Sequence, residues 1–339
     1  MRSFVTISVL EVFVTTVLAV PSVQKLQDGQ EVKLTIQQIK LTSESDIAVT
    51  DPKTSQLLGH ACSTTLNSGA FADLPISADL DHMGAGKITL GSKTYQVHED
   101  PEISGGVTCS RVYSDAQTYT ACTVILPESL DLAPVSKTDG CFAKGASPVF
   151  ENTIDLITTA QSTPLHPLEN VTIANRGLEE RQGACGIWSS YTATVGNGNP
   201  HQNYYNTQLS ENINCNCAVC SVGDEESESI TVGWSASATV DEWIDGGFDV
   251  QVSWTTGKQY TCQANPGDTV CIWYLTAHTA YTVQNYNYNQ CTGAQPSGTA
   301  IIFSPNKNNA GGYYYCVINS CANEGYHYWD YSGPAGGPP

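Results

Sequence analysis

Alternating apolar and polar residues predict β-strands through most of the first half of the chain. Residues 32–37 alternate Val, Leu and Ile with Lys, Thr and Gln, the period of a strand with one buried face. Residues 88–97 repeat this pattern on both sides of a Gly-Ser pair, a connection typical of a tight hairpin. Residues 150–160 instead carry apolar side chains at helical spacing, which predicts one short helix.

The second half of the chain alternates over longer stretches. Residues 230–240 and 248–255 place apolar residues between Ser, Thr, Gln and Asp, with a Gly-Gly pair between the two runs, so we expect a long β-hairpin. Residues 270–275 are continuously apolar, as in a central strand that is buried on both faces. Further short strands are expected at 281–283, 299–303 and 313–318.

The first residues have the features of a secretory signal peptide. Arg2 precedes an apolar stretch over 4–20, and Val17 and Ala19 form the small-residue pattern that signal peptidase recognises. Glu11 interrupts this stretch, and a carboxylate there disfavours retention as a membrane anchor. We therefore expect removal of residues 1–19 and secretion to an extracellular, oxidising environment where thiols pair.

A second processing signal lies near the middle of the chain, where the sequence Leu-Glu-Glu-Arg-Gln over 178–182 follows a polar stretch with two prolines. It resembles the kexin-type site of fungal secreted cysteine-rich precursors. The resemblance implies cleavage after Arg181, with Gln182 as the new terminus, although Glu180 stands where the stronger pattern has Lys or Arg. The alternative is an ordinary exposed linker.

These signals divide the chain into segments. Residues 20–163 form a β-rich, propeptide-like domain, 164–181 a linker with the processing site, 182–332 an aromatic-rich β domain, and 333–339 a Gly- and Pro-rich tail that we expect to be disordered. The linker contains the only glycosylation sequon of the chain, at Asn170. We predict two autonomous domains, the first of which assists folding or masks the mature surface.

The charge balance excludes some classes of partner. The chain has 339 residues and a formal charge of −19, which repels the phosphates of nucleic acids and anionic lipid headgroups. All six tryptophans and 14 of the 17 tyrosines follow Arg181, whereas only two basic residues do. A body that is rich in aromatic residues and poor in charge suits a rigid extracellular domain or a stacking surface.

Thirteen cysteines in an exported chain predict a disulfide framework. The first domain has four, Cys62, Cys109, Cys122 and Cys141, which can form two bridges in three ways. In the second domain a turn at 265–268 would bring Cys262 and Cys271 together, and Cys316 with Cys321 is a further expected pair. The CxCxxC run over 215–220 lacks a second CxxC, so we expect oxidation there rather than zinc.

The predicted fold is therefore all-β, with two disulfide-bonded, β-rich domains, of which the C-terminal one is a β-sandwich-like or extended antiparallel sheet. The usual catalytic motifs are absent from the sequence, and we expect no metal and no cofactor. Three functions remain.

In the preferred interpretation the protein is a secreted, non-catalytic binding or effector-like protein that acts on an extracellular glycan or a cell surface. Aromatic rings among Asn and Gly can stack on sugar faces while neighbouring amides bind the sugar hydroxyls. The alternative is that Tyr and Asn alternate in ordinary core strands. The candidate binding residues are Tyr204, Tyr205, Trp243, Tyr286, Tyr288, Tyr313 and Tyr314.

The second interpretation is a pore-forming toxin, the one case in which we expect a membrane partner. Each arm of the long hairpin has ten or more alternating residues, enough for a strand that crosses a bilayer. Aerolysin-like toxins are similar in this respect and in having a propeptide. A solvated hairpin with one core face is the alternative.

The third interpretation is a polysaccharide hydrolase that uses two carboxylates as acid and base or nucleophile. Its candidate residues are Glu211, Asp241, Glu242 and Asp249. We consider catalysis less favoured than binding, because no sequence pattern brings two of these carboxylates together.

Overall fold

The computed structural model describes residues 29–138, 140–142, 150, 153–162, 186–216, 218–224, 229–231, 253–255 and 260–337. Below, the N-terminal half means the described residues up to 162, and the C-terminal half those from 186 onward. Several predicted features lie outside the described residues: the signal peptide, the linker with Asn170, Arg181 and Gln182, and the hairpin residues Asp241, Glu242, Trp243 and Asp249.

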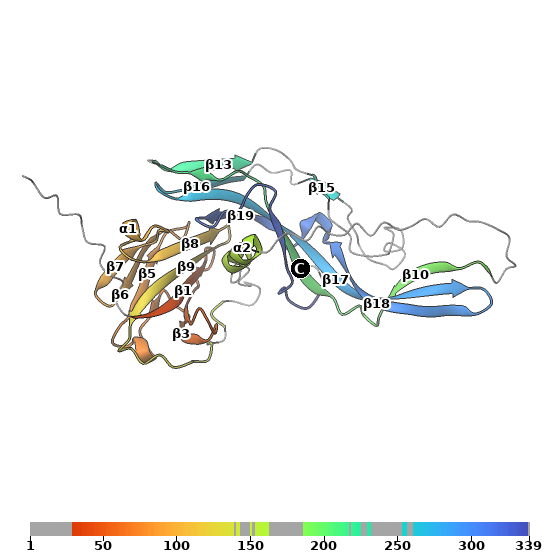
Figure 1. Cartoon of the computed structure of the whole chain (residues 1–339), viewed down its shortest axis with the longest axis horizontal. Coiled ribbons are helices and arrows are strands. Elements are labelled where there is room, and N and C mark those ends of the chain that lie inside the picture. The colour runs from red at the N-terminus through yellow and green to blue at the C-terminus, as the bar shows by residue number, and fades with distance from the viewer. Residues whose placement is uncertain are drawn as a thin grey trace, which may run out of the picture.

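Antiparallel strands make up most of both halves (Figure 1), so the all-β prediction is confirmed. The N-terminal half contains β1 (Gly29–Ile39), β2 (Ser45–Thr50), β3 (Leu57–Ala61), β4 (Thr65–Leu66), β5 (Ile76–Leu80), β6 (Gly86–Leu90), β7 (Lys93–Gln96), α1 (Pro101–Ser104), β8 (Thr108–Tyr113), β9 (Gln117–Pro127) and α2 (Thr153–Ser162). The C-terminal half contains β10 (Ser189–Thr194), β11 (His201–Gln208), β12 (Ile213–Asn214), β13 (Cys220–Asp224), β14 (Ser229–Thr231), β15 (Ser253–Thr255), β16 (Tyr260–Ala264), β17 (Thr269–Asn289), β18 (Gly293–Pro305), β19 (Tyr313–Ile318) and β20 (His327–Asp330).

The N-terminal half is a sandwich of two sheets. Strands β8, β9, β1, β2 and β3 form one layer, and β4 to β7 form the other. The apolar side chains of β1 that the alternation singles out, Val32, Leu34 and Ile36, are buried between the layers. The predicted hairpin is confirmed as β6 and β7, with Leu90 opposite Lys93.

Strand β17 is the centre of the C-terminal half and has 21 residues. Its first part pairs with β11 on one side and β19 on the other, so the apolar run 270–275 is buried on both faces, as predicted. The strand expected at 281–283 is the continuation of β17 rather than a separate element. Both faces of this first part of β17 are covered, because strand β16 packs on one of them and α2 on the other.

One continuous sheet joins the two halves, which differs from the autonomous domains that we predicted. In the order β20-β11-β17-β19-β8-β9-β1-β2-β3, strand β8 of the N-terminal half pairs with β19 of the C-terminal half. Figure 1 shows β8 and β19 next to each other, where the N-terminal half meets the C-terminal half. The two halves also share a core cluster, in which Phe150, Ile154 and Ile157 pack against Trp273 and Tyr315.

The helix that the spacing over 150–160 predicts is present as α2. Ile154 and Ile157 occupy its buried side, and Phe150 lies just before it. The helix thus covers the shared core, and the exposed Asp155 pairs with Lys33 of β1.

Disulfides are present in both halves, but two of the expected pairings are wrong. The structure joins Cys262 to Cys316 and Cys271 to Cys321, rather than Cys262 to Cys271 and Cys316 to Cys321. Neighbouring residues of β17 face opposite sides, so Ile272 contacts the cluster that contains Cys262, while Cys271 lies in the cluster on the other face. The turn between β16 and β17 places β16 above the sheet instead of beside β17.

The other described bridges agree with the expectation of oxidised cysteines. Cys62 pairs with Cys141 and Cys109 with Cys122, which selects one of the three connectivities left open for the N-terminal half. In the CxCxxC run, Cys215 pairs with Cys220, so these two sulfurs form a bridge rather than bind zinc.

The first residues of the tail are ordered rather than disordered. Gln202 donates its backbone N–H to the carbonyl of Pro334, and Gly336 donates to Pro200. At Gly333 a Cβ would lie 2.1 Å from the carbonyl oxygen of Gln202, so this close approach requires glycine. The tail thus continues the edge strand β20 alongside the first residues of β11.

Within the described residues, no helix has the length and apolar character needed to cross a bilayer.

Candidate binding surface

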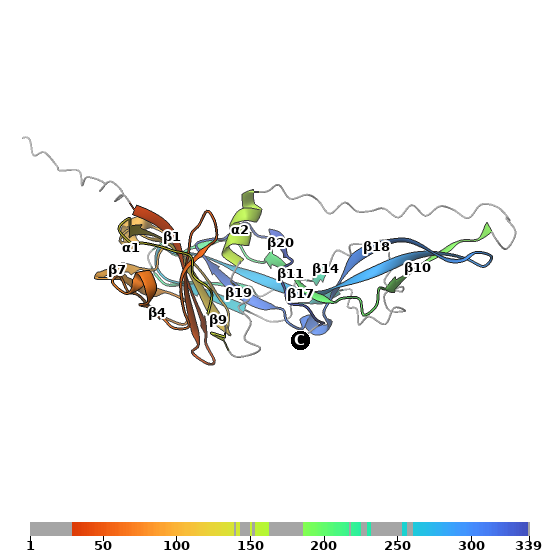
Figure 2. The same cartoon turned by 90° about the horizontal axis from the view of Figure 1, so that it is seen from below.

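A three-stranded arm, formed by β10, the distal part of β17 and β18, is the main candidate surface. Strand β10 pairs with β17 from Ser189 opposite Tyr288 to Thr194 opposite Val283, and β18 pairs with the other edge of β17. In Figures 1 and 2 this arm extends to the end of the molecule opposite the N-terminal half. Among the described elements, none other than β10, β17 and β18 reaches this end.

Strand alternation gathers aromatic rings on one face of this arm. Tyr191 lies directly opposite Tyr286, and their rings stack with centroids 5.0 Å apart and planes at 13°. Tyr288 is two residues further along β17 and therefore lies on the same face. The side chains of Tyr191 and Tyr288 are each 41% exposed, and that of Trp188, which directly precedes β10, is 52% exposed. The arm thus presents an open aromatic surface.

Side-chain amides hold the end of the arm together. The buried Asn289 donates from Nδ2 to the carbonyl of Ile187 at 3.2 Å, and its Oδ1 accepts the backbone N–H of Cys291 at 2.8 Å. Gln284 donates from Nε2 to the carbonyl of Gly298 at 2.8 Å. These bonds tie β10 and β18 to β17, so the exposed rings project from a braced sheet rather than from a free loop.

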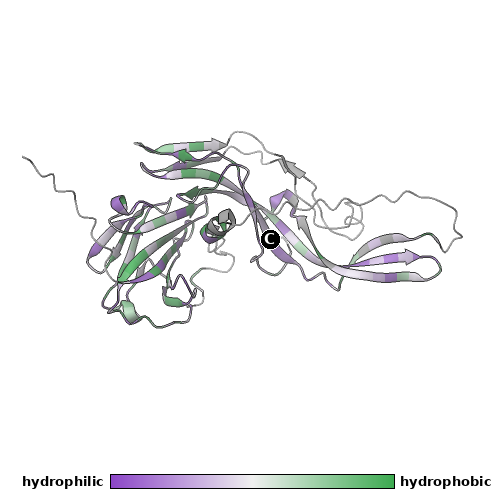
Figure 3. Ribbon diagram, viewed as in Figure 1, coloured by the Kyte–Doolittle hydropathy of each residue, from purple (hydrophilic) through white to green (hydrophobic). Residues whose placement is uncertain are grey.

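The arm carries no formal charge. Residues 182–210 and 269–306 contain no Asp, Glu, Lys or Arg, although the chain average of 14% would place about nine in these 67 positions. Figure 3 shows the arm mainly in white and purple, so its polarity comes from amides and hydroxyls. These two uncharged stretches are visible in the sequence and could have indicated the arm. Tyr191 and Trp188 were not among the predicted binding residues.

Such a surface suits a neutral polyhydroxyl ligand. Aromatic faces pack against the C–H faces of a sugar ring, and Asn, Gln, Ser and Thr offer donors and acceptors to its hydroxyls. Without charges, the surface needs no counter-charge on the ligand and loses little binding energy to salt. Residues 182–210 and 281–305 contain no carboxylate, so this arm itself supplies no acid-base pair for glycoside hydrolysis.

Two of the predicted binding tyrosines belong to the core instead. Tyr314 is buried, with ring centroids 4.6 Å from Tyr274 and 5.0 Å from Tyr260. Tyr313 packs on the opposite face of β19, against Phe150 with centroids 5.8 Å apart. Strand β16 covers one face of β19, and Phe150 with α2 covers the other, so these two rings cannot serve as a stacking surface.

A second aromatic group surrounds Tyr205. Tyr204 and Tyr205 are neighbours on β11 and face opposite sides: Tyr204 packs toward the shared core, whereas Tyr205 lies opposite Trp329 with centroids 5.0 Å apart. His327 lies 5.2 Å from Tyr205, and Trp329 stacks on Tyr331, whose side chain is 62% exposed. Partial burial raises the pKa of Tyr205 to about 12. This group is a second, smaller candidate surface.

His278 lies beneath this group, and its burial predicts a loss of stability in acid. The ring is fully buried, its Nδ1 donates to the carbonyl of Thr276, and Trp329 packs edge-on at 4.8 Å. Burial lowers the pKa of His278 to about 4, below the value of about 6.5 in an unfolded chain. The unfolded state therefore takes up this proton first as the pH falls, and stability present above pH 6.5 is lost between about pH 6.5 and 4.

We expect this one group to lower the free energy of unfolding by about 2 kcal/mol between pH 7 and pH 5. Urea titrations at several pH values measure the effect. His278→Gln should show a flatter pH profile over this interval, and an unchanged profile would assign the pH dependence to other groups.

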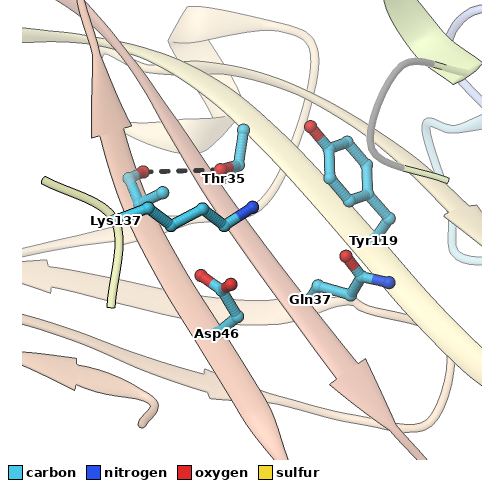
Figure 4. Close-up of a pocket in the computed structure, with 6 residues that line it drawn as sticks. Thr35, Gln37, Asp46, Tyr119 and Lys137 are labelled. Atoms are coloured by element: carbon cyan, nitrogen blue, oxygen red, sulfur yellow. Dashed lines mark hydrogen bonds between the residues drawn. The ribbon is translucent and has the colours of Figure 1, made fainter. Parts of the chain in front are cut away.

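A polar pocket lies on the N-terminal half (Figure 4), lined by Thr35, Gln37, Asp46, Ala48, Tyr119 and Lys137. Gln37 donates to Gln117 at 2.9 Å, and Asp46 accepts from Nε2 of His60 at 3.1 Å. Gln37 and Asp46 already form hydrogen bonds within the protein, so we do not favour this pocket as a ligand site.

Asp46, His60 and Cys141 form a cluster with ligand atoms within 4.8 Å of one another. The Cys141 sulfur is bonded to Cys62, however, and Nδ1 of His60 accepts the backbone N–H of Thr138 at 3.0 Å. The sulfur is therefore not a thiolate, and both ring nitrogens of His60 are engaged in hydrogen bonds, to Thr138 and to Asp46. These contacts hold β2, β3 and the segment around Thr138 together and do not form a metal site.

Among the predicted carboxylates, Glu211 is in the described part of the chain and is exposed between β11 and β12. The others, like Trp243, belong to the predicted hairpin and lie outside the described residues. Comparison with protein-family models, with curated proteins and with solved structures finds no match to the chain.

Proposed function

We propose that the protein is a secreted, non-catalytic binding protein that attaches to a neutral glycan on a cell surface or in the extracellular matrix. The observation that supports this most directly is the arm: exposed rings on a braced sheet, without one charge, in a protein of net charge −19. The rest of the molecule repels anionic surfaces, so an uncharged ligand fits best. The disulfides of both halves fit an extracellular location.

Substitutions in the arm test this function. We expect Tyr191→Ala, Tyr288→Ala and Trp188→Ala each to weaken binding to the recognised glycan by about 10- to 100-fold, because each removes an aromatic contact worth about 1.5–3 kcal/mol. Binding to glucan, chitin and xylan is measured by co-sedimentation and titration. Leu41→Ala, at an exposed apolar position of the N-terminal half, is the control that should leave binding unchanged.

Tyr331→Ala separates the two candidate surfaces. If this variant loses binding while the arm variants keep it, the group around Tyr205 is the binding site instead. Full binding by all four aromatic variants would contradict a glycan-stacking function for either surface.

The pore-forming function is a second candidate, and the base of the long hairpin supports it. Strands β13 and β16 pair with Asp224 opposite Tyr260, and β14 and β15 pair with Ser229 opposite Thr255. The two pairs have the same register: from Asp224 to Ser229 the chain advances by five residues, and from Tyr260 to Thr255 it goes back by five. The described base is therefore antiparallel, with the same register in both pairs, which is compatible with a hairpin between Thr231 and Ser253.

Dye release from neutral liposomes tests this second function. A pore-forming hairpin predicts leakage that is greater at pH 5 than at pH 7, because protonation of the acidic residues of the hairpin lowers the cost of insertion. Absence of leakage at both pH values would exclude the pore and leave the binding function.

A further inference from the structure

The N-terminal half completes the sheet of the C-terminal half. Strand β19 has β17 on one side and β8 on the other, with Cys316 opposite Tyr113, Val317 opposite Val112 and Ile318 opposite Arg111. Without β8, strand β19 would be an unprotected edge with open hydrogen-bonding groups. Natural proteins avoid such edges because they pair with other chains.

The same half covers an aromatic face of the C-terminal sheet. Trp273 and Tyr315 are completely buried, and Phe150, whose centroid is 5.4 Å from that of Tyr315, closes the cluster from the other half. Ile154 and Ile157 of α2 pack beside it. Removal of the N-terminal half would expose these large apolar groups to water, at about 25 cal/mol for each Å².

A buried ion pair links the halves at the turn between β16 and β17. The guanidinium of Arg111 donates to the carboxylate of Asp268, and both side chains are buried. Asn319 donates to the same carboxylate at 2.9 Å, and Arg111 also donates to the carbonyl of Met83 at 3.3 Å. Separation of the halves would leave two charged groups without their partner, a large penalty if either stays buried.

The backbone of this turn is shaped to fit against the N-terminal half. Gly267 has φ +90°, and a Cβ there would lie 2.7 Å from Nε2 of His98. Close by, the Tyr113 hydroxyl donates to the carbonyl of Gln263 and accepts its N–H, both at 2.7 Å. The contact is therefore specific as well as apolar.

The described disulfides do not cross this interface. Each one closes within a single half: two before the linker, and three after it.

From this interface we propose that the N-terminal half is a permanent subunit and not a discarded propeptide: cleavage between residues 163 and 182 leaves two chains that stay together without a covalent bond. The inference is independent of the glycan-binding function. The partner of the β19 edge is the N-terminal half itself.

The test uses the full chain with a site for a specific protease placed in the linker and cut after folding. Native mass spectrometry and gel filtration at about 1 μM are expected to show one species that contains both chains, and denaturing gels without reductant are expected to show two bands. Release of the N-terminal half in the native experiment would overturn the proposal. A single band on the gel would overturn its non-covalent part.

Variants of the interface give the second measurement. After the cut, Asp268→Asn is expected to raise the dissociation constant of the two chains by at least 100-fold. Phe150→Leu, a milder change in the shared core, should raise it by about 10-fold and serves if Asp268→Asn does not fold. Lys33→Met, which removes an ion pair inside the N-terminal half, is the matched control and should leave the constant unchanged. Equal dissociation constants for all three would overturn the assigned interface.

Discussion

Replacing Asp268 with alanine is expected to lower the free energy of unfolding by about 3–5 kcal/mol, because it leaves the buried Arg111 guanidinium without a counter-charge. The carboxylate also accepts hydrogen bonds from Asn319 and the backbone of Asn265, so the loss includes these contacts. Urea denaturation of the intact chain, followed by circular dichroism, measures the change.

Two further variants separate the ion pair from general damage. The double variant Arg111→Met, Asp268→Leu should recover at least half of the loss, because apolar groups of similar size remove the stranded charge. Lys33→Met breaks a partly exposed pair and is expected to cost less than about 1 kcal/mol. If Asp268→Ala costs no more than this control, the pair contributes little to joining the halves.

Replacing Phe150 with alanine is expected to cost about 3–5 kcal/mol, as for other large rings removed from a packed core. Because all six tryptophans follow Arg181, tryptophan fluorescence reports only on the C-terminal half. A substitution in the N-terminal half that shifts the midpoint of the fluorescence transition therefore shows that the halves unfold together.

The control for this experiment is Leu41→Ala, at an exposed position in the turn after β1, which should change stability by less than about 0.5 kcal/mol. If the halves unfolded independently, Phe150→Ala would leave the fluorescence transition unchanged and shift only the part of the circular dichroism signal that comes from the N-terminal half.

Local patterns in the sequence predict the strands well. The alternation over 32–37, the Gly-Ser hairpin and the apolar run over 270–275 correspond to β1, to the β6–β7 pair and to the start of β17. In each case a few neighbouring residues are sufficient for the prediction. A strand with one buried face alternates apolar and polar residues, and a strand that is buried on both faces is continuously apolar.

Relations between distant residues could not be predicted in this way. Arg111 and Asp268 are 157 positions apart, and no local pattern indicates that β8 pairs with β19. The same limit explains the wrong prediction of a Cys262–Cys271 disulfide. The turn at 265–268 makes these cysteines near neighbours in the chain, but their side chains lie on opposite faces of the sheet and bond to Cys316 and Cys321.

The candidate surface was only partly predictable for a similar reason. Tyr286 and Tyr288, which alternate with Asn, are in the arm, while Tyr313 and Tyr314, which begin a run of three tyrosines, are in the core. Strand patterns rich in Tyr do not distinguish an interior strand from an arm, because both use the ring as packing area. The absence of charge over the long stretches 182–210 and 269–306, which contain the strands of the arm, is the better indicator.

The β8–β19 pairing has a consequence for biosynthesis. Ser110 of β8 and Ser320, just after β19, are hydrogen-bonded although 210 positions separate them. The ribosome releases β8 long before β19, so the earlier segment can serve as a template on which the later strand docks. A permuted gene that begins at residue 186 and places the N-terminal half last would reverse this order, and its product should refold more slowly and aggregate more during translation.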